Sequence, residues 1–468
     1  MPILFDGQFK GLANSKWSGV RGSFAASVGI DGNSSPGTIT VHQKLTKNSG
    51  STVDALCKVV VAASNGYTFW FSSTSGKIFA RNSSGTWSLA YTTSPAAGSA
   101  GCLGAMEFNG HIYFATQSRL HRIAIADADD TWASVSADWA TFSVTDSEFH
   151  PMAIQDLSLF IGDGYKVCEV NSAGTFNNNV LDLKTPLRIK TMIDYELDLV
   201  IGTFIANTVN QAEIFRWDTV SPSWNSSDSI DEVGINAFIR DDNYLYVNAG
   251  RAGNLYFYNG ERLMPFKRIP GTYSSTQYGY IHPSAVANFK GVPIFGFSNG
   301  SGNPALEGVY SFGSYSRDYP KVLDLSWVIS EAVTTGIEIG AITVVDFDIL
   351  VAWKNGSSYG VDAIDYTAKY TGAYFETMML FQDKRDILKT LGEVSAFYNS
   401  LPASTGFTFS YSINGAAYVA MISVTDSVLA RVKSELSVGD IGSLQIKVAF
   451  TVSSNNAPVL EGLAVNLR

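Results

Sequence analysis

The chain has 468 residues, of which 46% are hydrophobic and only 16% are charged, and its formal net charge is −10. Proteins that coat nucleic acid neutralise phosphates with clustered Lys and Arg, whereas the basic clusters of this chain, such as Lys384-Arg385, are short and flanked by acids. Composition and charge therefore exclude nucleic-acid binding as the main function.

Gly (42 residues), Tyr (22) and Phe (28) are abundant, and Ser, Thr and Asn fill the gaps between apolar runs. Aromatic and β-branched residues favour strands, while Gly and Asn favour tight turns because they tolerate a positive φ. This composition predicts an all-β protein with many short strands.

The sequence carries no recognisable export or membrane signal. No run of about 18 apolar residues occurs, and residues 1–7 have neither a basic region nor a long apolar region, so neither a membrane span nor a signal peptide is expected. Three scattered cysteines give no disulfide framework and no metal-ligand spacing, so we expect buried, reduced thiols: Cys57, Cys102 and Cys168. The N-x-S/T sequons are interpreted as turn residues: Asn33, Asn82, Asn225, Asn299 and Asn355.

Residues 1–60 are rich in Gly and Ser and are expected to form an N-terminal arm that supplies the strand closing a ring of blades. Residues 61–371 then repeat one unit: a short apolar strand, a tight turn, a second strand and often a Trp or Phe. The seven copies pair residues 67–71 with 77–81, 111–115 with 120–124, 157–161 with 165–170, 197–201 with 212–217, 244–248 with 254–258, 292–295 with 308–312, and 348–353 with 359–364.

The centres of the first strands in these copies are separated by 44, 46, 40, 46, 49 and 56 residues. A period of about 40 to 50 residues with four short strands per unit is typical of β-propeller blades. A single small sheet cannot bury both of its faces, but blades packed around an axis cover one another, and closing the ring removes the terminal edges. The sequence therefore predicts a β-propeller of about seven blades, with six or eight as alternatives.

Residues 372–468 follow a different pattern. Residues 406–413 alternate strictly, with Phe407 and Phe409 on one face and Thr408 on the other, and Asn414-Gly415 is a strong hairpin signal. Residues 444–452 alternate again, and residues 463–467 form a last strand. Strands with one apolar face must pack on a second sheet, so we predict a C-terminal β-sandwich.

No motif in the sequence supports catalysis. Residues 296–300 match the Gly-x-Ser-x-Gly nucleophile elbow, but Ser301 to Pro304 cannot start the required helix and no His follows His282, so we interpret the motif as a glycine-rich propeller turn. Residues 82–87 resemble a degenerate form of the structural Asp-box turn of sialidases. Acids expected at blade turns, which could serve a glycosidase as a carboxylate pair, are Asp163, Asp241 and Asp242.

Binding motifs are equally weak. The segments 127–130 and 225–231 could gather oxygens for Ca²⁺, but neither fits the twelve-residue loop pattern. No metal spacing is present among His42, His111, His121, His150 and His282. Aromatic residues in expected turns could stack on sugar rings or pack against a neighbouring blade: Tyr273, Tyr278 and Tyr280. We therefore assign no catalytic, cofactor-binding or metal-binding residues and expect no cofactor and no enzymatic activity.

Three stretches resemble the propeller-bearing tail proteins of tailed bacteriophages: residues 9–40, residues 76–87 and residues 398–416. The resemblance rests on turn and strand formulae, so no functional residues are carried over. It implies a virion structural protein in the tail, as a nozzle, tip or adhesion component, assembled in the host cytoplasm. The implied partners are other tail proteins and further copies of the chain, in a symmetric ring or trimer.

Two alternatives to this structural role remain. The first is an adhesin of the tail that binds a host-surface glycan or another receptor through the propeller or the terminal domain. The second is a propeller glycosidase or depolymerase. Saturable glycan binding would favour the first alternative, and release of reducing sugar that depends on one axial acid would favour the second.

Overall fold

The computed structural model of the chain describes residues 3–5, 9–14, 22–35, 37–93, 101–144, 148–205, 209–242, 244–271, 273, 278–299, 306–314, 321–331, 336–380, 389–425 and 431–467. In these ranges the only helical element is the short 3-10 turn η1 (Ile125–Asp127), and all other regular structure is β. The described residues contain no helix that is long and apolar enough to cross a membrane. The predicted all-β class is confirmed.

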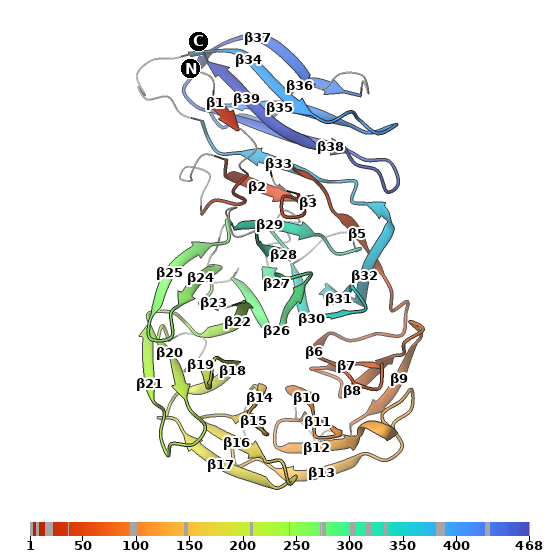
Figure 1. Cartoon of the computed structure of the whole chain (residues 1–468), viewed down its shortest axis with the longest axis vertical. Coiled ribbons are helices and arrows are strands. Elements are labelled where there is room, and N and C mark those ends of the chain that lie inside the picture. Colours follow the sequence, from red (N-terminus) through yellow and green to blue (C-terminus); the bar gives the residue numbers. More distant parts are fainter. Residues whose placement is uncertain are drawn as a thin grey trace.

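Four-stranded antiparallel sheets surround a central axis, as the predicted propeller requires (Figure 1). The first three blades are β6 (Cys57–Ala62), β7 (Thr68–Ser72), β8 (Lys77–Arg81) and β9 (Trp87–Thr92); β10 (Gly104–Phe108), β11 (His111–Ala115), β12 (Arg119–Ala124) and β13 (Ser136–Thr141); β14 (Met152–Gln155), β15 (Ser158–Asp163), β16 (Lys166–Val170) and β17 (Phe176–Asp182). The next two are β18 (Arg188–Tyr195), β19 (Asp198–Phe204), β20 (Ala212–Trp217) and β21 (Ser226–Ile230); β22 (Ile235–Asp241), β23 (Tyr244–Ala249), β24 (Asn254–Tyr258) and β25 (Leu263–Arg268).

The sixth and seventh blades are joined into one eight-stranded sheet by a single pairing of Asn299 with Ile337. The sixth blade contains β26 (Gly279–Phe289), β27 (Val292–Asn299), β28 (Gly308–Gly313) and β29 (Val322–Trp327). The seventh contains β30 (Ile337–Val345), β31 (Asp348–Asn355), β32 (Ser358–Lys369) and the N-terminal strand β5 (Gln43–Lys47), which pairs antiparallel with β32. The described strands thus form seven blades, the number that the spacing predicts.

The ring is closed by contacts between innermost strands. Each innermost strand contacts the innermost strand of the next blade, and β30 of the seventh blade contacts β6 of the first. The edge of the seventh blade is completed by β5, so a segment from the N-terminal arm covers a strand that would otherwise be open. Buried side chains fill the spaces between blades, for example Phe71 against Phe114 of the neighbouring blade at 5.9 Å between ring centroids.

One hairpin geometry recurs between the first and second strands of six blades. Two residues separate the paired strand ends, and the first of them has a positive φ of 45–57°: Asn109, Asp156, Glu196, Asp242, Lys290 and Asp346. Such turns match the twist of the strands they join, and Asn and Asp tolerate this backbone conformation best. The first blade differs, because a longer turn separates β6 from β7.

Two further sheets lie beyond the sixth and seventh blades (Figure 1). One contains β1 (Ile3–Phe5), β39 (Leu460–Leu467), β34 (Lys389–Tyr398) and β37 (Arg431–Ile441), and the other contains β2 (Phe24–Val28), β33 (Tyr374–Thr377), β38 (Leu444–Thr451), β35 (Gly406–Ile413) and β36 (Val419–Val424). The N-terminal segment also forms a small pair, β3 (Ile30–Asp31) with β4 (Thr40–Val41). Both ends of the chain therefore contribute strands to this terminal region.

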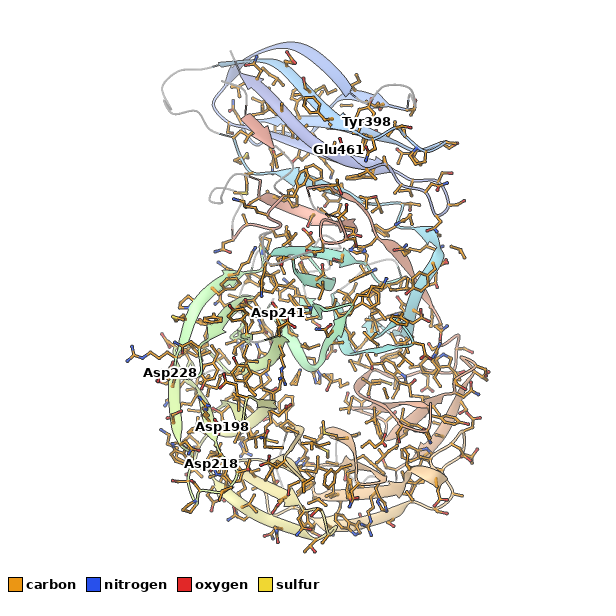
Figure 2. The ribbon with its side chains drawn as sticks, in the orientation of Figure 1. Asp198, Asp218, Asp228, Asp241, Tyr398 and Glu461 are labelled. Carbon is orange, nitrogen blue, oxygen red and sulfur yellow. The ribbon has the colours of Figure 1, made fainter. Side chains whose placement is uncertain are left out.

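Side chains from the two terminal sheets share one buried cluster. Tyr398 of β34, labelled in Figure 2, is 1% exposed, and its ring lies 5.5 Å from that of Phe407 of β35 in the other sheet. The alternation predicted for residues 444–452 holds at Leu444, Ile446, Val448 and Phe450, which are buried. It fails at Val452, which is half-buried, and at Gln445, which is buried although it was expected on the other face. In β35, Ser412 is also buried, so its two faces are less distinct than expected. The sandwich itself stays a prediction.

Candidate functional site

A pocket of about 240 Å³ lies at one end of the propeller axis, where the innermost strands begin. Its walls come from different blades, because Lys58 belongs to β6, Lys190 to β18, Asn236 to β22 and His282 to β26. Only closure of the ring brings these side chains together. We call it the axial pocket and treat it as the candidate site, because ligand sites in proteins are usually concave and carry a few convergent polar groups.

Lys190 is a buried base in the axial pocket with a strongly lowered pKa. Its Nζ donates a hydrogen bond of 2.8 Å to Oδ1 of Asn236 and lies 5.4 Å from the ring centroid of Phe149 and 5.8 Å from that of Phe204. Burial disfavours the ammonium and lowers the pKa of Lys190 to about 8, although nearby Glu148 favours the charged form. A lysine in this state carries a charge that solvent screens poorly, or supplies a free amine in mildly alkaline solution.

A second cation, Lys58, is neutralised within the structure. Its Nζ lies 2.6 Å from Oε1 of Glu338 in β30, and the hydroxyl of Tyr280 donates to the same carboxylate oxygen at 3.3 Å. Burial and the Glu338 carboxylate raise the pKa of Tyr280, so its hydroxyl keeps its proton at neutral pH. This cluster connects the first, sixth and seventh blades.

Arg251 and His282 complete the polar lining. The guanidinium carbon of Arg251 lies 4.5 Å from the ring centroid of Tyr278, a side chain that is 38% exposed. His282 is 8% exposed, its Nδ1 accepts a hydrogen bond from the backbone N–H of Ser284, and burial lowers its pKa well below the ordinary value. His282 is therefore neutral. The charged residues of the lining are Lys58, Lys190, Arg251 and Glu148, and Lys58 is paired with Glu338. In this part of the chain three cations therefore lie close to the two carboxylates of Glu148 and Glu338.

An adjoining cavity of about 260 Å³ continues along the axis and shares Lys190 and His282 with the axial pocket. Its lining includes Met106, Met152 and Met192 from three consecutive blades. Met side chains are flexible and polarisable, so they adapt to irregular apolar surfaces.

The three tyrosines named in the sequence analysis lie in different environments. Tyr278 and Tyr280 line the axial pocket, where Tyr278 keeps an exposed ring surface and Tyr280 is engaged with Glu338. Tyr273 instead donates to the backbone carbonyl of Ile269 at 2.7 Å and packs under Arg268. Tyr278 alone among the three has a ring placed to stack on a ligand in the pocket.

The Gly-x-Ser-x-Gly motif does not form a nucleophile elbow. Residues 296–299 lie in β27, so their interpretation as a glycine-rich turn is wrong, while residues 300–304 lie outside the described residues. Ser298 is 2% exposed, and its Oγ accepts a hydrogen bond of 2.9 Å from the backbone N–H of Ile339. A Cβ on Gly296 would lie 2.2 Å from Cγ2 of Ile339, so close packing of two blades explains this glycine.

The degenerate Asp-box segment is a turn that occurs twice. In Asn82-Ser-Ser-Gly-Thr-Trp87, Oδ1 of Asn82 accepts hydrogen bonds from the backbone N–H groups of Ser84 and Thr86. In the third blade, Oδ1 of Asn171 accepts from the N–H groups two and four residues on in the same way. Both asparagines connect the third strand of a blade to the fourth, so their role is structural.

The candidate acids lie in the third blade (Asp163) and the fifth blade (Asp241 and Asp242), and the first two are held by structural contacts. Asp163, at the end of β15, is fully buried and accepts hydrogen bonds of 3.0 Å from the backbone N–H groups of Ser143 and Val144. Asp241, at the end of β22, is paired with Lys321. Asp242 occupies a hairpin turn with a φ of 47°. The carboxylates nearest the candidate site are instead Glu148 and Glu338, which the sequence did not single out.

The two aspartate-rich segments, residues 127–130 and 225–231, also serve turns and strand edges. Asp129 accepts from the backbone N–H of Thr131, and Asp228, at the outer rim of the propeller in Figure 2, accepts from the N–H of Leu263 at 2.7 Å. Within the described ranges, no group of three or more His, Cys, Asp or Glu side chains could hold a metal ion.

The cysteines and the remaining histidines lie within the blades or at their junctions. Cys57, Cys102 and Cys168 are buried and form no disulfide. His150 is fully buried and hydrogen-bonds to the carbonyl oxygens of Gly162 and Gln117. His121 stacks on Phe114, and His111 is hydrogen-bonded to the carbonyl of Asn109.

No protein-family model matches the sequence, and no curated protein matches it. Among solved structures, the extracellular domain of the one component system BT4673 from B. thetaiotaomicron is 12% identical, with a TM-score of 0.46, 78% of this chain covered and 44% of that chain covered. A streptogramin B lyase is 12% identical, with a TM-score of 0.46 and coverage of 69% and 97%. Virginiamycin B lyase from Staphylococcus aureus is 10% identical, with a TM-score of 0.47 and coverage of 69% and 99%. This chain thus spans less than half of the first of these proteins, and at such identities the likeness concerns the propeller fold alone.

Proposed function

We propose that this chain is a structural component of the tail of a tailed bacteriophage and acts through protein–protein assembly. The observation that carries the proposal concerns the stretches that resemble such tail proteins. The first (residues 9–40) and the last (residues 398–416) lie far apart in the sequence, yet β2 and β35 belong to the same five-stranded sheet. The resemblance is thus concentrated in a region formed by both ends of the chain, next to a closed propeller.

This terminal region offers an edge for assembly. Among the described strands, β36 pairs only with β35, and the side chain of Val419 in β36 is 51% exposed. An open edge with exposed apolar side chains is a template for adding a strand from another subunit. We infer that β36 is the attachment edge and that the propeller is the rigid body presented by it.

The experiment compares particles assembled with wild-type chain and with a Val419→Lys variant, because lysine on an edge strand opposes strand addition. We expect wild-type chain to co-sediment with tails and the variant to stay unassembled although it is folded. The matched control is Leu157→Lys, which replaces another exposed apolar residue, 74% exposed in a propeller turn, and should assemble normally. Absence of the wild-type chain from purified particles would refute the proposal.

The axial pocket supports a second candidate, an adhesin that binds an acidic glycan of the host surface. The specific observation is that Lys190 and Arg251 line this pocket beside the exposed ring of Tyr278. Cations suit a sugar carboxylate, and an aromatic ring suits a sugar face. Glucuronate titrated against the protein should bind saturably, and Tyr278→Ala should weaken binding about tenfold. If the protein instead releases reducing sugar from a host polysaccharide, and Glu148→Gln abolishes the release, the chain is a depolymerase.

A further inference from the structure

A larger cavity, of about 580 Å³, lies away from the axis where the N-terminal segment meets the sixth and seventh blades. Its walls include Asp31, Asn33 and His42 from the N-terminal segment, Trp327 from β29 and Tyr366 from β32. We call it the junction pocket. Its volume falls within the range of about 300–1,000 Å³ that is usual for small-molecule sites.

Three buried polar atoms of the junction pocket lack a hydrogen-bond partner. They are Oδ1 of Asn33, Nε2 of His42 and Nε1 of Trp327. Their residues are 9%, 8% and 4% exposed, and all three line the cavity. The nearest charged group to His42 is the carboxylate of Asp31, whose Oδ1 is 3.8 Å from Nε2, beyond hydrogen-bond range. A buried polar atom without a partner costs about 1–3 kcal/mol, so three around one cavity indicate a site made for a polar ligand.

These side chains are held in fixed orientations. Nδ2 of Asn33 donates to Oγ of Ser311 at 2.9 Å, which places the amide so that Oδ1 is the group left to accept. The imidazole of His42 lies on the indole of Trp327, with 4.3 Å between ring centroids. The indole is also packed edge-to-face against Phe289 at 5.9 Å. Each of the three unpartnered atoms exposes less than 1 Å² of surface, so a ligand hydrogen-bonds to them only after the neighbouring side chains shift.

The chemistry of the three atoms specifies the ligand class. Trp327 Nε1–H can only donate, Asn33 Oδ1 can only accept, and a neutral imidazole can do either at Nε2. Burial lowers the pKa of His42, which keeps the imidazole neutral. The charged groups in the lining, the Asp31 carboxylate and the Lys290 ammonium, balance each other. Neighbouring hydroxyl groups, which both donate and accept and carry no charge, match this arrangement.

We propose that the junction pocket binds a neutral sugar, whose hydroxyls satisfy Asn33, His42 and Trp327 while its apolar face lies against the aromatic wall. Phe289 and the 43%-exposed Tyr366 provide that wall. The inference is independent of the virion proposal, because it concerns the isolated chain. It also concerns a different cavity from the axial pocket, whose lining includes Lys58, Lys190 and Arg251.

The test is saturation-transfer NMR on the purified full chain with glucose, galactose, rhamnose and N-acetylglucosamine, each in large molar excess. We expect transfer to the ring protons of at least one sugar. We also expect an about tenfold higher dissociation constant in Trp327→Phe, which removes the Nε1–H donor, and in Asn33→Leu, which removes the Oδ1 acceptor together with the amide that donates to Ser311. The control is Trp70→Phe, since Nε1 of Trp70 is also buried and unpartnered but lies outside the junction pocket.

The proposal is overturned if none of the four sugars gives a transfer signal. It is also overturned if a sugar binds with unchanged affinity to both Trp327→Phe and Asn33→Leu, or if Trp70→Phe weakens binding as much as they do. Inorganic phosphate and Ca²⁺ are added as competitors, and displacement of the sugar by either ion at equimolar concentration would assign the pocket to a charged ligand instead. The two variants are compared by thermal unfolding first, so that a loss of folding in one leaves the other to decide.

Discussion

Lys58 and Glu338 form an ion pair, with 2.6 Å between Nζ and Oε1, across the seam at which the seventh blade meets the first. Their side chains are 30% and 27% exposed, so solvent screens them less than a pair on the open surface. The pair therefore links ring closure to the electrostatics of the axial pocket.

We predict that this pair contributes about 1 kcal/mol to the free energy of unfolding. A double-mutant cycle with Lys58→Met and Glu338→Gln, followed by urea denaturation, measures the coupling. The matched control is Arg240 with Asp194, which joins β22 to β18 at 3.3 Å but is about half exposed on both sides. Its coupling should be smaller, and an equal or larger value would contradict a special role of the seam.

The second prediction concerns the pH dependence caused by Lys190. The pKa of Lys190 is about 8 in the folded chain, against 10.5 ordinarily, so the unfolded chain binds more protons between these values. Stability must then rise with pH across this window, and the penalty of about 3 kcal/mol for the buried charge is fully present below pH 8. Lys190→Met removes the titration.

Urea denaturation of the wild type and of Lys190→Met at pH 7 and pH 10 checks this prediction. The wild type should gain about 2–3 kcal/mol relative to the variant at the higher pH. Because both proteins share every other titrating group, the difference isolates Lys190. A constant difference between the two proteins would mean that Lys190 titrates normally in the fold.

The sequence predicts the second and third strands of each blade well, because both alternate or are continuously apolar and enclose a turn. The innermost strands carry a weaker signal. For example, β10 has one buried residue and four half-buried ones, since its position beside the axial channel requires no apolar alternation. The axial pocket could not be predicted at all from spacing, because Lys190 and Arg251 belong to different blades and meet only through ring closure.

The third prediction concerns Lys290, an unusual residue in the recurring hairpin turn. Lys290 has a φ of 53° and precedes Gly291, with a φ of 80°, in a turn that favours Asn-Gly. Lys290→Asn should raise the free energy of unfolding by about 0.5–1 kcal/mol, because asparagine tolerates the left-handed region better. Thermal and urea denaturation measure it. Lys354→Asn, at the next-to-last residue of β31, should give no such gain, and an equal gain there would rule out the turn explanation.

The last prediction concerns Asp324 of β29, which receives a hydrogen bond of 3.3 Å from Ser27 of β2 and so joins the sixth blade to the terminal region. The carboxyl is fully buried, and its Oδ2 has no hydrogen-bond partner in the structure. Burial raises the pKa of Asp324 to about 7, although nearby Lys267 lowers it. The folded chain therefore binds more protons than the unfolded chain between about pH 4 and pH 7.

The stabilising effect of the neutral carboxyl is fully present below pH 4 and is lost as the pH rises through 7. Relative to Asp324→Asn, which stays neutral, the wild type should lose up to about 4 kcal/mol between pH 4 and pH 8. Lys267→Met should extend this loss to higher pH, because the Lys267 ammonium favours the charged carboxylate. Without Lys267 the pKa of Asp324 rises further, so the neutral carboxyl persists to a higher pH. A pH series of urea denaturations should therefore show the stability loss ending at a higher pH in Lys267→Met than in the wild type. A wild-type curve parallel to that of Asp324→Asn would show that the carboxyl titrates as it does in the unfolded chain.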